Sequence, residues 1–309
     1  MIVHHGYENL KLKRPFVTIG VFDGVHMGHM SLIEHLVGKA GREGGESVIV
    51  TFNPHPRLVL SKPGENISYL STIDEKVNLM EKSSAGHLVI INFTPEFAGM
   101  DADTFISRIL VKGIGVEYLV MGHDNHLGKG KEGDFERIKV KAARYGFSVE
   151  RLGKYSSGND TVSSTSIRMA LLEGKLDDAN RWLGYHYPLS GTVIEGRGLG
   201  KSFGFPTANI KPDDPNKLIP ADGVYAVEVI TGKNRMKGML SIGSNPTVSR
   251  GEKTKSVEVN IFDFDGDLYG KEITAIFRFR LRDEIHFGSI MELKQQMKLD
   301  QETSLRLLT

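Results

Sequence analysis

Two histidines separated by two residues are the side chains of this sequence that most directly suggest chemistry. His26 and His29 lie in the segment GVFDGVHMGH, residues 20–29, between an apolar run and a run whose apolar residues have helical spacing. The pattern predicts a strand that ends at Phe22, a tight turn and a helix that begins near Gly28. Amide groups at the start of a helix attract phosphate, and two imidazoles there would add hydrogen-bond donors. We therefore expect the histidines to stabilise negative charge in a phosphoryl-transfer transition state rather than to act as bases.

A structural role in the turn and a zinc site are the alternative interpretations of this pair. For zinc, no third ligand with matching spacing is evident in the sequence. The succession of strand, turn and helix favours phosphate chemistry over both alternatives.

The segment VSSTSIR, residues 162–168, places hydroxyl groups and one arginine at the expected start of another helix. Helix capping alone would need only one of the hydroxyls. Three hydroxyls followed by a guanidinium one turn later are typical of a helix start that binds a polyanion. We therefore expect phosphate binding from four side chains: Ser163, Ser164, Thr165 and Arg168.

A glycine-rich segment, residues 195–210, reads EGRGLGKSFGFPTANI. Its GKS tripeptide resembles the end of a Walker A loop, but that motif needs a glycine where Glu195 stands, and no helical pattern follows. The glycines still allow the backbone to approach a ligand, and Lys201 supplies positive charge. If the segment is extended, Thr207 and Asn209 face the same side, where their oxygen atoms suit Mg²⁺ bound to nucleotide phosphates.

A second glycine-rich segment, MGHDNHLGKGKEGD at residues 121–134, contains Lys129 and Lys131. It is either a solvated loop or a loop that approaches a phosphate-bearing ligand. The sequence alone leaves both interpretations open.

Three side chains in the last third of the chain also have open roles. Polar and apolar residues alternate over residues 256–261, which places Glu258 on the polar face of a strand, either as an exposed residue or as a carboxylate of a site. Arg282 and Phe287 either stack on a ring ligand and supply charge to it, or mark a charged strand exit.

Five motifs together resemble those of one protein family, the prokaryotic bifunctional riboflavin kinases/FAD synthetases. Residues 20–29 resemble the HxGH signature of nucleotidyltransferases in the form that this family has. Residues 51–57, TFNPHPR, resemble its TFxPHP segment, residues 121–134 its glycine-rich loop, and residues 162–168 its SSTxIR motif. GFPTAN at residues 204–209 resembles the signature of the kinase module. The motifs occur in the family's order and span nearly the whole chain.

The resemblance implies a fold and two activities. The fold is an N-terminal doubly wound α/β domain, which is Rossmann-like, followed by a small β-barrel domain that ends in a helix. The barrel is implied to phosphorylate riboflavin to FMN with ATP, and the N-terminal domain to transfer AMP from ATP to FMN, which gives FAD and pyrophosphate. ATP is then the co-substrate, FMN and FAD are products, and Mg²⁺ is the expected cofactor.

The resemblance also implies roles for individual residues. For adenylyl transfer the catalytic residues are His26 and His29, and the nucleotide contacts are Gly20, Phe22, Asp23, Gly24, Asp124, Ser163, Ser164, Thr165 and Arg168. The flavin contacts of that domain are Asn53, Pro54, His55 and Pro56. For the kinase the general base is Glu258, the Mg²⁺ ligands are Thr207 and Asn209, and the nucleotide contacts are Gly198, Gly200, Lys201, Gly204, Pro206, Thr207 and Asn209. The flavin contacts of the kinase are Arg282 and Phe287.

Three residues depart from the family's pattern. Asn125 and Leu127 stand where the loop at 121–134 usually has aromatic residues, and Asn260 replaces a histidine that often follows the general base by two residues. These departures keep two alternatives open. One is a flavin- or nucleotide-binding module whose transferase site has decayed, and the other is a single-activity adenylyltransferase with an inert barrel. The intact GFPTAN segment together with Glu258 argues against the second alternative.

The elements that must position these residues follow two patterns. In the first half, short apolar runs alternate with segments of helical spacing. The expected strands are 16–22, 47–52, 87–93, 117–121 and 147–152, and the expected helices are 31–40, 72–81 and 134–145. Such alternation indicates a doubly wound parallel sheet, which binds ligands at the carboxyl ends of its strands.

In the second half, two helices over residues 163–184 precede short strands of period two over residues 187–282. The strands indicate a small β-barrel or sandwich, and a last helix is expected over 289–299.

The change of pattern places the domain boundary at Gly184. We expect an adenylyltransferase domain over 1–184 and a kinase domain over 185–309, joined by a short linker at 185–188.

Bulk composition agrees with a protein of two domains that acts on small molecules. The chain has 309 residues, a net charge of +1 and no cysteine. The charge gives no general electrostatic reason to expect nucleic acid or an acidic membrane as a partner, and the absence of cysteine excludes disulfides, thiolate metal sites and a cysteine nucleophile. Without a signal peptide or a long apolar run, we expect a cytoplasmic protein. Riboflavin, FMN and ATP are the partners that the family resemblance implies. The sequence does not indicate an oligomeric state.

Overall fold

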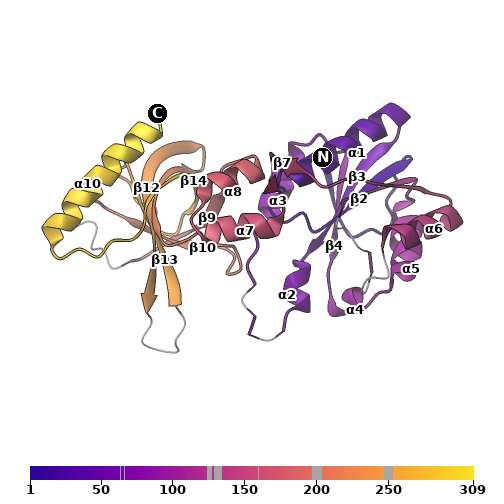
Figure 1. Ribbon diagram of the computed structural model, residues 1–309, viewed down its shortest axis with the longest axis horizontal. Helices are drawn as coiled ribbons and strands as arrows, with labels where there is room; N and C mark the ends of the chain where they lie inside the picture. The colour runs from indigo at the N-terminus through magenta and orange to yellow at the C-terminus, as the bar shows by residue number, and fades with distance from the viewer. Residues whose placement is uncertain are drawn as a thin grey trace. The chain divides into compact units, whose positions relative to one another are not determined.

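The computed structural model describes the whole chain except residues 63, 66, 124–126, 129–133, 159, 197–203 and 247–252. The described residues form two compact units, Met1–Ser164 and Thr165–Thr309 (Figure 1). Among these residues, no helix combines the length and the apolar character that crossing a membrane requires. The cytoplasmic location expected from the sequence stays a prediction.

A six-stranded parallel sheet forms the centre of the first unit. Its strands are β1 (Ile2–His5), β2 (Pro15–Ile19), β3 (Glu46–Asn53), β4 (His87–Asn92), β5 (Tyr118–Met121) and β6 (Ser148–Arg151). They lie in the order β1-β4-β3-β2-β5-β6, so the direction of winding reverses between β2 and β5. Parallel sheets bind ligands outside the carboxyl ends of the strands at such a reversal. The segment that contains His26 and His29 follows β2 directly.

Helices cover both faces of this sheet (Figure 1). They are α1 (Met27–Glu43), α2 (Pro56–Leu60), α3 (Ile73–Glu81), α4 (Pro95–Ala98), α5 (Ala102–Thr104), the π-helix η1 (Phe105–Ile114) and α6 (Phe135–Tyr145). Side chains of α1 and α3 share one apolar core with Ile49 of β3, whereas η1 and α6 share the other core with Val48 and Val50. Successive residues of a strand point to opposite faces, so β3 contributes to both cores. The doubly wound α/β fold expected from the sequence is therefore confirmed.

Helix capping accounts for two helix starts that the sequence predicted correctly. Thr72 and Glu75 form a capping box at the start of α3, and Asp134 accepts a hydrogen bond from the backbone N–H of Arg137 at the start of α6. Each such interaction satisfies a backbone donor that the first turn of a helix leaves unpaired.

Three details of the first unit differ from the sequence-based expectation. The strand expected over 16–22 ends at Ile19, and the φ of 49° at Phe22 excludes that residue from an extended strand. The helix expected to begin near Gly28 begins at Met27. The sequence also gave no indication of β1, a four-residue edge strand that pairs in parallel with β4.

The second unit contains a closed antiparallel barrel and its covering helices. The strand order is β10-β13-β12-β11-β14-β9, which decides between the barrel and the sandwich in favour of the barrel. The strands are β9 (Pro188–Ile194), β10 (Ala208–Pro212), β11 (Gly223–Thr231), β12 (Asn234–Pro246), β13 (Lys253–Ile261) and β14 (Glu272–Arg282). Closing the sheet leaves no exposed strand edge for another chain to pair with.

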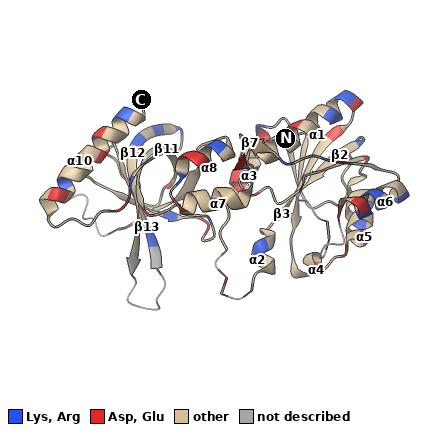
Figure 2. Cartoon of the chain, in the orientation of Figure 1, with Lys and Arg blue, Asp and Glu red and all other residues tan. Residues whose placement is uncertain are grey.

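Helices precede and follow the barrel. They are α7 (Ser164–Leu172), which begins where the two units divide, α8 (Leu176–Leu183) and α10 (Ile290–Leu307). The last helix extends to Leu307 rather than to residue 299, and Ser289 caps its start. A short hairpin of β7 (Ser156–Ser157) and β8 (Asp160–Thr161) belongs to the first unit. Figure 2 shows residues of both charge signs on α1, α8 and α10.

Candidate active sites

The loop between β2 and α1 presents His26 as the N-cap of α1. The His26 side chain is 6% exposed, and its Nδ1 accepts a hydrogen bond of 3.4 Å from the backbone N–H of His29. In the neutral ring this acceptor role leaves the proton on Nε2. His26 therefore lies at a helix N-terminus, where backbone amides favour an anion.

His29 lies one turn further, against the face of the His26 ring. The two ring centroids are 3.6 Å apart with an angle of 16° between the planes, and Phe22 packs edge-on against His29. Burial, the His26 ring and the ammonium of Lys76 together lower the pKa of His29 well below its usual range. A neutral imidazole is consistent with the expectation that His29 donates a hydrogen bond rather than accepting a proton from the substrate.

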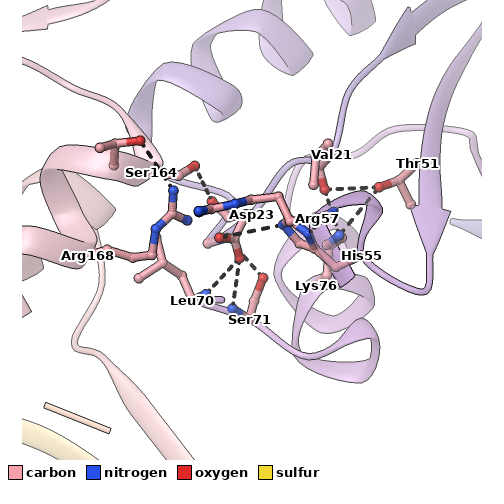
Figure 3. A network of polar contacts seen from close by, with 12 residues as sticks. Val21, Asp23, Thr51, His55, Arg57, Leu70, Ser71, Lys76, Ser164 and Arg168 are labelled. Atoms are coloured by element: carbon pink, nitrogen blue, oxygen red, sulfur yellow. Dashed lines mark hydrogen bonds and ion pairs between the residues drawn. The ribbon is translucent and has the colours of Figure 1, made fainter. Parts of the chain in front are cut away.

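Asp23 fixes the shape of this loop from inside the fold (Figure 3). Its Oδ1 accepts hydrogen bonds of 2.8 Å and 3.2 Å from the backbone N–H groups of Leu70 and Ser71, and the Gly24 N–H donates to the Ser71 hydroxyl at 2.9 Å. The backbone carbonyl of Asp23 accepts a further bond of 2.9 Å from the Ser164 hydroxyl. The Asp23 carboxylate thus positions the HxGH segment.

The same carboxylate brings the TFxPHP segment to the site. His55 Nε2 lies 3.9 Å from Asp23 Oδ2, and the His55 ring stacks on Tyr69. His55 also caps α2, because its Nδ1 accepts a hydrogen bond of 3.1 Å from the Arg57 N–H, and Pro56 begins that helix. Three motifs that are far apart in sequence therefore meet at Asp23.

A cavity of about 590 Å³ lies at the carboxyl ends of β1, β3 and β4. Of the four residues expected to contact flavin in this unit, Asn53 lines the cavity. Apolar side chains of Phe97 and Met100 line another part of it. Its volume is in the range of roughly 300–1,000 Å³ that small-molecule sites occupy.

The SSTxIR segment is divided between the two units. Ser163 and Ser164 belong to the first unit, whereas Thr165 and Arg168 belong to the second. Within α7 the Arg168 guanidinium donates a hydrogen bond of 3.3 Å to the Thr165 hydroxyl.

The glycine-rich loop at 121–134 is described only in part. Asp124, Asn125 and both lysines lie outside the described residues. Leu127 is 5% exposed and belongs to the apolar core beneath η1 and α6, and Gly128 has a φ of 78° and lies against the backbone of Ala102. A side chain on Gly128 would overlap that backbone, so the loop leaves the core in a conformation that requires glycine.

The second unit brings the GFPTAN segment beside Glu258. The Thr207 hydroxyl donates to Glu258 Oε2 at 3.4 Å, and Asn209 of β10 pairs in register with Glu258 of β13. Gly196 lies against the Asn209 side-chain amide so closely that a Cβ would overlap it. Hydroxyl, amide and carboxylate oxygens are thus gathered at one place on the barrel wall.

Two further features of this site bear on the expected nucleotide contacts. Asn260 is 5% exposed, and its amide donates a hydrogen bond of 2.7 Å to the carbonyl of Pro206, which fastens the GFPTAN segment to β13. Gly204 has a φ of 88°, which is a left-handed backbone conformation that favours glycine. Gly198, Gly200 and Lys201 lie outside the described residues.

Arg282 is held by an ion pair with the last helix. Its guanidinium forms bidentate hydrogen bonds with Asp300 of α10. The Arg282 Nε lies 3.1 Å from both carboxylate oxygens, and Nη2 lies 2.7 Å from Oδ2. The centre of the guanidinium is 5.9 Å from the centroid of the Phe287 ring. Arg282 and Phe287 are therefore adjacent, and their expected contact with flavin stays a prediction.

Comparison with known proteins assigns a family to each unit. A family model described as FAD synthetase matches residues 9–166, and one described as riboflavin kinase matches residues 183–308. The bifunctional riboflavin kinase/FMN adenylyltransferase of Listeria monocytogenes is 36% identical over 93% of this chain and 90% of its own length. This chain belongs to the bifunctional riboflavin kinase/FMN adenylyltransferase family. The Escherichia coli member is 35% identical over 93% of this chain and 91% of its own.

Solved structures agree with the fold of this family member. A crystal structure described as a macrolide-efflux protein from Streptococcus pneumoniae has a TM-score of 0.88 and 28% sequence identity. The match covers 98% of this chain and 99% of that one.

Two of the departures from the family's pattern have a structural explanation. Leu127 is a core residue, so its apolar side chain anchors the loop of this family member. Asn260, at the position where the family resemblance implies a histidine, donates a hydrogen bond to the carbonyl of Pro206. The zinc interpretation gains no support, because no group of three or more His, Asp or Glu side chains that could hold a metal occurs among the described residues.

Lys76 is a residue beneath the β2–α1 loop that sequence reasoning missed. Its side chain is 3% exposed, and its ammonium donates to the Val21 carbonyl at 2.6 Å and to the Thr51 hydroxyl at 3.5 Å. A signal was present in the sequence, because Lys76 lies one turn before Met80 on the buried side of α3. A lysine within an apolar helix face is rare without a partner.

We expect Asp300→Asn to destabilise the barrel of this family member. The mutation leaves the guanidinium of Arg282, whose side chain is 18% exposed, without its charged partner, so the free energy of unfolding should fall by about 3 kcal/mol. Urea unfolding can be followed by the fluorescence of Trp182, the single tryptophan of the chain, which lies in α8 of the second unit. The matched control is Asp283→Asn, which removes the exposed partner of Arg280 and should cost less than about 1 kcal/mol. Equal urea concentrations at the unfolding midpoints of Asp300→Asn and Asp283→Asn would contradict the expectation.

Proposed function

We propose that this protein makes FAD from riboflavin in two ATP-dependent steps, one in each unit. The observation that carries the proposal is the convergence of the HxGH, TFxPHP and SSTxIR segments on Asp23 (Figure 3). The barrel of the same chain separately brings together Thr207, Asn209 and Glu258. Each set of residues suits the binding of a polyphosphate. The order of the two family models along the chain supports the same assignment.

In the first unit, a phosphate oxygen of FMN attacks the α-phosphorus of ATP. The bond from that phosphorus to the bridging oxygen of pyrophosphate breaks, and FAD and pyrophosphate leave. The attacking phosphate is already ionised near neutral pH, so no side chain has to remove a proton from it. His26, His29 and the N-terminal amides of α1 stabilise the charge that develops on the phosphoryl oxygens. Ser163, Thr165, Arg168 and Asp124 are assigned to the nucleotide on the resemblance alone.

In the second unit, a ribityl hydroxyl of riboflavin attacks the γ-phosphorus of ATP. The bond between that phosphorus and the bridging oxygen of ADP breaks, and Glu258 accepts the hydroxyl proton. The Thr207 hydroxyl, 3.4 Å from the carboxylate, orients Glu258 for this step. Gly198, Gly200, Lys201, Gly204 and Pro206 are assigned to the nucleotide phosphates.

Magnesium is the cofactor that the kinase site fits. The donor set there consists of oxygens from Thr207, Asn209 and Glu258, and Mg²⁺ prefers oxygen ligands and shares them with nucleotide phosphates. Thr207 and Asn209 would hold the ion. Bound there, it would neutralise charge on the triphosphate.

The flavin ring of FMN is assigned to the cavity at the ends of β1, β3 and β4. Asn53 supplies a polar group at its edge, and Phe97 and Met100 supply apolar surface for a ring. Pro54, His55 and Pro56 continue from Asn53 and set the direction of the chain there. In the barrel unit, Arg282 and Phe287 are assigned to the ring of riboflavin.

The functional boundary is proposed at Gly184, with residues 1–184 serving adenylyl transfer and 185–309 serving the kinase. Gly184 ends α8, and the kinase family model begins at residue 183. The compact units divide earlier, after Ser164, since α7 and α8 contact the barrel through bonds such as the 2.9 Å one from Ala221 N–H to the Leu171 carbonyl.

One assay tests the proposal against its alternatives. Purified protein is incubated with ATP, Mg²⁺ and either riboflavin or FMN, and the flavins are separated by chromatography. We expect FMN and FAD from riboflavin, and FAD from FMN. Tight flavin binding without turnover would instead indicate a decayed module. FAD from FMN but no FMN from riboflavin would indicate an inert barrel.

A further inference from the structure

Lys76 places a buried positive charge beneath the loop that carries the two histidines. The ammonium donates to the carbonyl of Val21, which lies in the β2–α1 loop, and to the hydroxyl of Thr51 on β3 (Figure 3). The Thr51 hydroxyl also donates to the Val21 carbonyl, at 3.2 Å. The carbonyl therefore has two donors, of which the ammonium is the nearer and the charged one.

The charged and titratable groups around Lys76 come from the β2–α1 loop and from helices α1, α2 and α3. Asp23 of the loop is the charge that favours the ammonium, and His29 of α1 is the group that the ammonium disfavours in its protonated form. His26 is stacked on His29, and His55, at the start of α2, is 3.9 Å from Asp23. On α3 itself, Glu75 is held by the backbone N–H of Thr72.

Burial of this ammonium costs stability that the fold does not recover locally. Burial outweighs the attraction of Asp23 and lowers the pKa of Lys76 to about 8. Between this value and the usual 10.5, the unfolded chain binds a proton that the folded chain has lost, so the free energy of unfolding rises with pH across that window. At neutral pH the charged lysine thus lowers the free energy of unfolding. A buried lysine at this position therefore needs an explanation other than stability.

We propose that Lys76 is a positioning residue for adenylyl transfer, which holds the loop between β2 and α1 through a charge-assisted hydrogen bond to the Val21 carbonyl. The inference rests on the function proposed above for the first unit. A deprotonated lysine still donates a hydrogen bond to Val21, but that bond is weaker, and the side chain no longer balances the charge of Asp23.

The pH dependence of FAD formation tests the role of the charge. In the wild type, the rate of FAD formation from FMN and ATP should decline as pH rises through about 8. In Lys76→Arg the side chain stays charged across this range, so the decline should be absent while activity is retained. The rate of riboflavin phosphorylation by the same sample is the internal reference. As pH rises, the ratio of FAD formation to riboflavin phosphorylation should fall in the wild type and stay constant in Lys76→Arg.

Lys76→Met separates positioning from a merely structural role. Methionine is an apolar chain of similar length, so the variant should melt at a higher temperature than the wild type. We expect kcat for FAD formation to fall on the order of 10- to 100-fold, with a smaller change in KM for ATP. The matched control is Lys82→Met at the exposed C-cap of the same helix, which should change neither quantity.

The outcomes distinguish this inference from the proposed function. If the wild type makes no FAD at any pH, the proposed function itself is wrong. If the wild type makes FAD and Lys76→Met does so within twofold, with an unchanged pH profile, Lys76 has no positioning role. A lower melting temperature for Lys76→Met together with lost FAD formation would also overturn the inference, because a structural role would then suffice.

Discussion

Replacing His29 by alanine should reduce FAD formation by about 10²- to 10³-fold, the usual effect of removing one donor from a charge-stabilising site. The ring of His29 is stacked on His26 with centroids 3.6 Å apart, so its loss also removes the support that orients the N-cap histidine. Because the pKa of His29 lies well below its usual range, the wild-type ring is neutral at physiological pH. The variant therefore loses a hydrogen-bond donor rather than a charge.

Riboflavin phosphorylation by the same His29→Ala sample is the measurement that locates the effect. We expect it to continue at the wild-type rate, because the barrel belongs to a different compact unit. His35→Ala is the matched control on α1, where the imidazole lies within hydrogen-bond distance, 3.1 Å, of Glu150 on β6. It should leave FAD formation within about twofold of the wild type, as surface changes usually do. Loss of both activities in His29→Ala would argue against two separate sites.

Replacing Glu258 by glutamine should abolish the other activity. The amide has nearly the shape of the carboxylate and can still accept a hydrogen bond from Thr207, but it cannot accept a proton from the ribityl hydroxyl. Removal of a general base typically costs about 10²- to 10⁴-fold in rate. Chromatography should show little FMN formed from riboflavin, whereas FAD should still form when FMN is supplied.

A surface glutamate of the same barrel provides the comparison for this variant. Glu272→Gln, at the exposed start of β14, should keep both activities. If Glu258→Gln phosphorylates riboflavin as fast as the wild type, then Glu258 is not the base. If FMN formation is absent from the wild type as well, the barrel is inert, and the interpretation of the chain as a single-activity adenylyltransferase would replace the present one.

Much of the architecture could be predicted from sequence because it depends on local signals. Apolar runs of strand length alternated with helical spacing, and the capping box at Thr72 marked the start of α3. The strand β1 could not be found in this way, since its four residues form an edge strand that pairs with β4, 85 residues further along the chain. The premature end of β2 was equally hidden, because the left-handed backbone at Phe22 is set by packing and by the pairing of Asp23 with Leu70 and Ser71.

The candidate sites likewise combine features that local spacing predicted with contacts that it could not predict. Spacing alone indicated that His26 and His29 belong to one helix start, and that Thr207 and Asn209 face one side of a strand. It could not indicate that Asn260 fastens Pro206, or that Arg282 is committed to Asp300 on the last helix. These contacts join residues that have no regular spacing between them.

The amino-acid sequence by itself determined the two kinds of domain, the order of the motifs and the residue types available for phosphate chemistry, because these depend on neighbours within a few positions. Only the tertiary structure decided which distant groups meet. It placed Ser164 and His55 at Asp23, and it buried the ammonium of Lys76 under the loop of the histidines. The physical reason is that the pKa of a side chain and its freedom to move depend on burial and on charges from other elements, which are fixed only when the chain has packed.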